Sequence, residues 1–145
     1  MQKITTYLWF DHQAEEAANH YVAIFGNSRV LEVSPMMVTF ELEGQRFMAL
    51  NGGPRFRFNE AVSLFVDCES QEEVDELWAR LTADGGEDGS CGWLKDKYGL
   101  SWQVIPRALP TLLSDPDPVR AERVTKAMLG MSKIDVKALQ DAYDG

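Results

Sequence analysis

Residues 11–25 read DHQAEEAANHYVAIF, and a related stretch, DCESQEEVDELWARL, follows at residues 67–81. Each stretch begins with an aspartate and continues with apolar residues at helical spacing, so each predicts a helix. The similarity extends beyond the helices, because Gly44 in a later turn matches Gly99 in another turn. The matches share shifts of 55 to 57 residues along the chain. Several matches at nearly one shift indicate a duplicated unit.

The segments around both helices are rich in β-branched and aromatic residues, which favour strands. In the first half we expect strands at residues 3–10, 29–34, 36–43 and 46–51, with a helix over residues 14–25. In the second half we expect strands at residues 61–67, 91–95 and 100–105. Asp11 is expected to cap the first helix, and Ser70 with Glu73 forms a capping box for the second. The first half therefore has a βαβββ pattern, and its match to the second half indicates a repeat of the same type.

Two such repeats packed together predict an α+β fold, with a curved mixed sheet that forms a cup and a helical C-terminal tail. We expect a single domain over residues 1–145, with repeats at residues 2–54 and 59–107 and the tail at residues 108–145. In the tail, the two Asp-Pro steps at residues 115–118 and Asp135 predict helix starts.

The composition limits the classes of partner. The net charge is −9, which disfavours binding to nucleic acid or to an anionic membrane surface. No stretch approaches the ~18 apolar residues of a membrane span, and the first residues do not resemble a signal peptide. We therefore expect a cytoplasmic protein in which Cys68 and Cys91 are reduced thiols.

Several stretches carry a family resemblance. They are Tyr7–Phe10, Ala14–Ala17, Phe47–Pro54, Phe58–Ala61 and Cys91–Gln103. They resemble PhnB-like proteins, a group often labelled as 3-demethylubiquinone-9 3-methyltransferase domains, within the vicinal-oxygen-chelate (glyoxalase/bleomycin resistance/dioxygenase) superfamily. The resemblance implies the cup fold, a small-molecule ligand and a homodimer. The apolar residues Val124, Met128 and Met131 of the tail also favour a homodimer, because they offer an apolar surface.

The resemblance also tests for a metal site. In the superfamily, each half offers His or Glu from its first and last strands to one divalent cation. Here Gln103 occupies the position of the ligand Glu, and Met48 matches it in the first half. His12 and His20 fall in the first helix region rather than on a strand, so we expect no metal. We expect no bound cofactor either, because Gly52–Pro54 ends in proline and does not open a helix.

The candidate ligand-binding residues lie on or beside strands of the expected cup. They are Trp9, Met48, Asn51, Asn59, Ser63, Cys91, Trp93, Lys95 and Gln103. Large aromatic groups with a few hydrogen-bonding groups suit a small-molecule pocket, although aromatic residues suit a hydrophobic core equally well. Strand alternation requires Trp102 and Gln103 to face opposite sides of the sheet, and it separates Trp9 from Phe10 in the same way.

Three functions fit the sequence, and whether the protein is an enzyme stays open. The first is an unidentified small molecule bound in the cup without the usual metal. The second is a divalent-metal-dependent lyase, isomerase or dioxygenase with unusual ligands, which include Gln103 and Glu60. The third is a partner-binding protein that acts through its tail. In that case, deletion of residues 109–145 would abolish partner binding and leave the rest folded.

Overall fold

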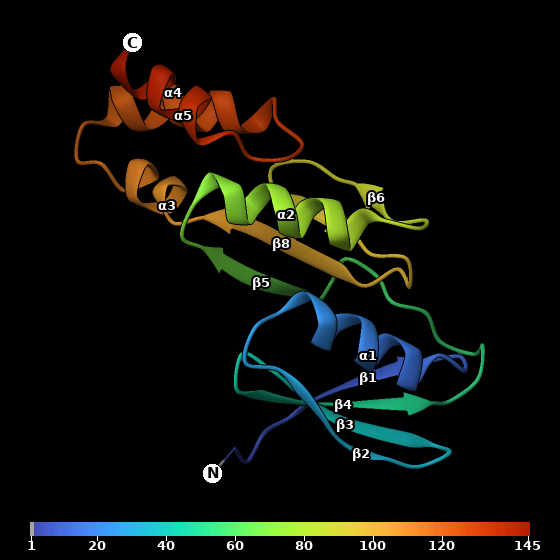
Figure 1. Cartoon of the computed structure of the whole chain (residues 1–145). Coiled ribbons are helices and arrows are strands. Elements are labelled where there is room, and N and C mark those ends of the chain that lie inside the picture. The colour runs from blue at the N-terminus through green and yellow to red at the C-terminus, as the bar shows by residue number, and fades with distance from the viewer. Residues whose placement is uncertain (1) are drawn as a thin grey trace. The chain divides into compact units, whose positions relative to one another are not determined.

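The computed structural model describes residues 2–145, which form two compact units. One unit comprises the described residues up to Phe58, and the other comprises Asn59–Gly145. Each unit is a four-stranded mixed sheet with a helix packed on it (Figure 1).

In the first unit, the sheet has the order β1-β4-β3-β2. Its elements are β1 (Thr6–Phe10), α1 (Ala14–Ile24), β2 (Arg29–Val33), β3 (Met37–Leu42) and β4 (Gln45–Asn51). Strand β1 runs parallel to β4, and the other pairs are antiparallel. Helix α1 packs its small residues and the buried Tyr21 onto β3 and β4, where Phe40 and Phe47 stack with ring centroids 5.5 Å apart.

The second unit repeats this arrangement, with the sheet order β5-β8-β7-β6 and β5 parallel to β8. Its elements are β5 (Ser63–Cys68), α2 (Gln71–Thr82), β6 (Glu87–Asp88), β7 (Trp93–Lys95) and β8 (Ser101–Pro106). The shared strand order confirms the α+β fold built from two βαβββ repeats. Strand β6 was not expected, because its two acidic residues have low strand propensity.

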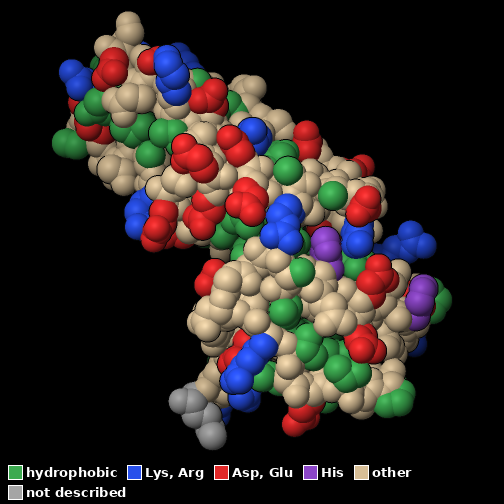
Figure 2. Space-filling view, viewed as in Figure 1, with side chains coloured by type: hydrophobic (Ala, Val, Ile, Leu, Met, Phe, Trp, Pro, Cys, Tyr) green, Lys and Arg blue, Asp and Glu red, His purple; other side chains and the backbone are tan. Residues whose placement is uncertain are grey.

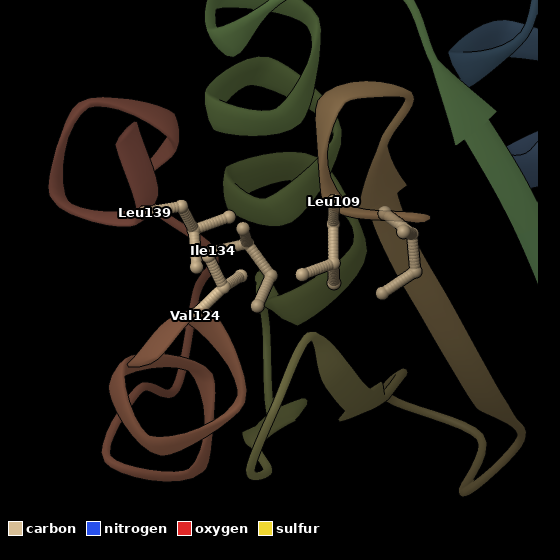
Figure 3. Close-up of a cluster of buried hydrophobic side chains, with 5 residues drawn as sticks. Leu109, Val124, Ile134 and Leu139 are labelled. Atoms are coloured by element: carbon tan, nitrogen blue, oxygen red, sulfur yellow. The ribbon is translucent and has the colours of Figure 1, made fainter. Parts of the chain in front are cut away.

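The tail consists of α3 (Ala108–Leu113), α4 (Pro118–Leu129) and α5 (Val136–Asp144), and it belongs to the second unit. Figure 3 shows Leu109, Val124, Ile134 and Leu139 pointing toward one another, and Ile105 of β8 completes this buried cluster. Met128 and Met131 pack against it. The apolar residues that favoured a homodimer therefore pack against other residues of the same chain. The homodimer itself stays a prediction.

Helix starts show where local sequence was sufficient. Ser70, Asp117 and Asp135 cap α2, α4 and α5 as expected, because each side chain accepts a hydrogen bond from a backbone N–H of the first turn. The predicted cap at Asp11 is wrong. Helix α1 begins later, and Asn51 at the end of β4 accepts the hydrogen bond from the Ala14 N–H at 2.9 Å.

Burial agrees with the predicted alternation at the two pairs of neighbouring residues for which it was stated. Trp102 is 2% exposed on β8, which α2 contacts, while its neighbour Gln103 is only partly buried. Phe10 is likewise buried and Trp9 is partly exposed. The acidic residues of α2 face solvent, and Figure 2 shows red side chains gathered in this region. Within residues 2–145, no helix combines the length and the apolar character needed to cross a membrane.

Candidate functional site

One face of the second sheet collects polar and aromatic side chains. The registers pair Trp93 with Gln103, and Gln103 with Phe65 on the other side. Lys95 pairs with Ser101, and Ser101 pairs with Ser63. Paired residues share a face of a sheet, so these side chains lie on the face opposite to Trp102. The predicted residues Ser63, Trp93, Lys95 and Gln103 are therefore brought together.

A hollow of about 430 Å³ opens on this face. It lies entirely within the second unit and is lined by Glu60, Glu87, Asp88, Gly89, Ser90, Trp93, Leu94, Lys95 and Ser101. A hollow of this volume falls in the range of small-molecule sites. Two of the predicted residues, Trp93 and Lys95, contribute to its lining.

Lys95 is held by charge on two sides. Its ammonium forms an ion pair with Glu60, and Glu87 is its partner across β6 and β7. The hydrogen bond to Glu60 raises the pKa of Lys95, and the same bond lowers the pKa of Glu60. Lys95 therefore stays protonated at neutral pH and does not serve as a general base for its neighbour Ser101. The arrangement suits binding better than covalent catalysis.

Ser101 forms the buried part of the hollow. It is 1% exposed, and among the described residues its hydroxyl has no hydrogen-bond partner. An unpaired buried hydroxyl destabilises the folded state, so its presence in a hollow points to a ligand group. The sequence analysis missed Ser101. Strand alternation from Gln103, two residues further along β8, would have placed it on the same face.

Gln103 and Ser63 bind each other beside the hollow. The Gln103 amide Nε2 donates to the Ser63 Oγ at 2.9 Å. The other predicted residues of this unit lie nearby in sequence but are engaged differently. Asn59 is exposed and accepts a hydrogen bond from the Ala61 N–H, and Cys91 is partly buried in a backbone conformation with φ of 58°.

The remaining predicted residues belong to the first unit. Trp9 donates its indole N–H to the Gly53 carbonyl at 2.9 Å, and its ring lies so close to Gly52 that a Cβ there would be 2.4 Å away. Asn51 uses its amide to hold the Pro35 carbonyl and the start of α1. Met48 is partly buried on β4. Ligand contacts of these residues stay predictions.

The fold family implies a divalent metal, and the residues present do not fit one. Met48 and Gln103 occupy equivalent positions on the central strands β4 and β8, and neither side chain is a strong ligand for such an ion. The Glu60 carboxylate is paired with Lys95. Among residues 2–145, no three His, Cys, Asp or Glu side chains are gathered as metal ligands.

Cys68 is the other cysteine that we expect to be a reduced thiol, and it is buried away from this face of the sheet. Its pKa predicts how the stability of the folded state depends on pH. Burial raises its pKa from the ordinary 9.0 to about 12, and the carboxylates of Glu73 and Asp67 act in the same direction. In the unfolded chain the thiol loses its proton near pH 9.0, whereas the folded chain retains it. The folded state thus binds more protons in this window, so stability falls as the pH rises.

We expect the free energy of unfolding to fall between about pH 9 and 12, with a contribution from Cys68 below ~1.4 kcal/mol per pH unit. Urea unfolding of the wild type and of Cys68→Ala, at pH values below and above about 9, measures the contribution. Other titrating groups act equally in both proteins. Equal slopes in the two proteins would contradict it.

Comparisons with solved structures define the class of protein. The PhnB protein from Bacillus cereus is 36% identical, with 72% of this chain and 99% of that chain covered and a TM-score of 0.68. A glyoxalase/bleomycin resistance protein from Albidiferax ferrireducens is 13% identical, with 70% and 95% covered and a TM-score of 0.51. A fosfomycin resistance protein from Listeria monocytogenes, complexed with Mn(II) and sulfate, is 17% identical, with 70% and 88% covered and a TM-score of 0.51.

These likenesses show the fold of the vicinal-oxygen-chelate superfamily. The sequence model of the family described as 3-demethylubiquinone-9 3-methyltransferase matches residues 2–105. The chain belongs to this family, and is PhnB-like within the superfamily. No curated protein matches the chain.

Proposed function

We propose that the protein binds a small organic molecule in the hollow of its second unit, in the cytoplasm and without a catalytic metal. The observation that carries the proposal is the hollow itself, with the partly exposed Trp93 and the unpaired Ser101 hydroxyl on one sheet face. An apolar ring beside a few converging polar groups is the usual make-up of a small-molecule site. Trp9, Met48, Asn51, Asn59, Ser63, Cys91 and Gln103 stay predicted ligand contacts.

A titration with small aromatic probes, followed by nuclear magnetic resonance, tests this proposal. We expect benzyl alcohol, benzylamine or benzoate to shift the Trp93 indole signal and the backbone amides of residues 87–95 and 101. The variant Trp93→Leu should lose at least about tenfold in affinity, because it removes the aromatic wall of the site. Tyr7→Leu is the matched control, because Tyr7 is a half-exposed aromatic residue on β1 of the other unit. The proposal fails if no probe shifts the signals of the hollow.

A metal-dependent enzyme that uses Gln103 and Glu60 is the second candidate. What speaks against it is that the Glu60 carboxylate is occupied by Lys95 and that the neutral amide oxygen of Gln103 is a weak ligand for a transition metal. The test is the metal content of protein equilibrated with Mn, Fe, Ni or Zn. Near-stoichiometric metal that is lost in Gln103→Ala would favour the enzyme over the metal-free binding protein.

A further inference from the structure

The hollow carries an excess of negative charge. Its lining includes three carboxylates, those of Glu60, Glu87 and Asp88, and a single cation, Lys95. Lys95 is already paired with Glu60. Glu87 shares Lys95 with Glu60, and the Asp88 carboxylate accepts a hydrogen bond from the Trp78 indole. One cation cannot offset three carboxylates, so the lining keeps a net negative charge, which favours a ligand of positive charge.

The aromatic wall favours the same kind of ligand. Trp93 is partly exposed and lines the hollow. The face of an indole ring attracts a cation more strongly than other aromatic rings do. A cation seated against Trp93 would also lie near the carboxylates of the rim.

The buried Ser101 hydroxyl supplies an acceptor. Its oxygen has two lone pairs that no group of the described chain uses, and the residue faces the hollow beside Lys95. An ammonium group brings N–H donors that would satisfy this oxygen. This observation is independent of the surface charge, because it concerns a single buried atom.

We propose that the hollow takes an organic ammonium ion, which donates an N–H to the Ser101 hydroxyl, rests on the Trp93 ring and is attracted by Glu87. This inference rests on the proposed binding function and names its ligand class. An anionic ligand would meet the carboxylates of the rim and would have to displace Glu60 from Lys95.

Benzylamine, benzyl alcohol and benzoate share an aromatic ring and differ in charge. Comparing their affinities therefore separates the effect of ligand charge from that of the ring. We expect benzylamine, a cation at neutral pH, to bind about tenfold more tightly than the neutral benzyl alcohol, and benzoate to bind most weakly. The preference should shrink as salt is added, because the rim is exposed. Chemical-shift titration of the Trp93 indole signal measures all three affinities.

Two variants that each remove one negative charge test whether the Glu87 carboxylate attracts the cationic ligand. Glu87→Gln should weaken benzylamine about fivefold and leave benzyl alcohol nearly unchanged. Glu72→Gln is the control, because it removes the same charge from the exposed face of α2, outside the hollow. Equal losses in the two variants would overturn the role of Glu87.

Ser101→Ala separates binding from folding. It removes an unpaired buried hydroxyl, so we expect a melting temperature about 3 °C higher, together with about fivefold weaker benzylamine binding. A variant that is more stable but binds benzylamine normally would overturn the role of the hydroxyl. If benzyl alcohol or benzoate binds the hollow best, the ammonium inference fails and the proposed function stands. If no probe binds there, both fail.

Discussion

Replacing Asp96 with alanine is expected to lower the free energy of unfolding by about 3 kcal/mol. Asp96 is 2% exposed at the turn between β7 and β8. Its Oδ1 accepts hydrogen bonds from the N–H groups of Tyr98 and Leu100, at 2.9 and 3.0 Å, and its Oδ2 accepts one from the Trp102 indole at 2.9 Å. Alanine would leave the Leu100 and Trp102 donors buried without this acceptor.

The loss should extend to the hollow, because this turn joins the strands that carry Lys95 and Ser101. Asp88→Ala is the matched control for stability. Asp88 also accepts a hydrogen bond from an indole, that of Trp78 at 3.0 Å, but it is exposed, so water replaces it and the expected cost is below about 1 kcal/mol. Urea unfolding measures both variants. A loss for Asp96→Ala no larger than that for Asp88→Ala would show that the buried network contributes little.

Ile134→Ala is expected to lower the free energy of unfolding by about 3 kcal/mol, because it opens a cavity in the tail cluster. Ile134 is fully buried, and it packs beneath Gly92, where an added Cβ would lie 3.1 Å from the Ile134 Cγ1. The tail also holds the chain just before β7, since the N–H groups of Cys91 and Gly92 donate to the carbonyls of Met131 and Ser132 at 2.9 and 2.8 Å.

This prediction bears on the partner-binding alternative. Deletion of residues 109–145 would remove most of the cluster that covers Ile105, so we expect the second unit to unfold. Leu129→Ala is the control for the point variant, because Leu129 is 62% exposed and its loss should cost less than about 0.5 kcal/mol. Urea unfolding and the far-ultraviolet circular dichroism of the truncated chain measure these effects. A truncated chain that keeps a folded second unit would favour the tail as a separate partner-binding segment.

The fold could be predicted because its signals are local and repeated. Helical spacing and the capping residues Ser70, Asp117 and Asp135 each act within a few residues, so they can be recognised without coordinates. The doubled pattern repeats such local signals in the second half of the chain. The cap of α1 was missed for the opposite reason. Asn51 lies 37 residues from Ala14, and only the pairing of β1 with β4 brings its side chain to the helix start.

The candidate site divides in the same way. The sequence was sufficient to place Gln103 and Trp102 on opposite faces and to show that Gln103 and Met48 replace strong metal ligands, because strand alternation and residue chemistry are local properties. The register of β7 and β8 was needed to place Trp93 and Lys95 on the face of Gln103.

The sequence by itself thus determined the doubled pattern, from residues 11–25 and 67–81 together with the strand-like segments around them. Only the tertiary structure showed that Glu60 forms an ion pair with Lys95 and that the Ser101 hydroxyl is buried without a hydrogen-bond partner among the described residues. Those properties depend on which atoms from distant segments surround a side chain, and it is the packing of β5 to β8 with the preceding loop that decides this.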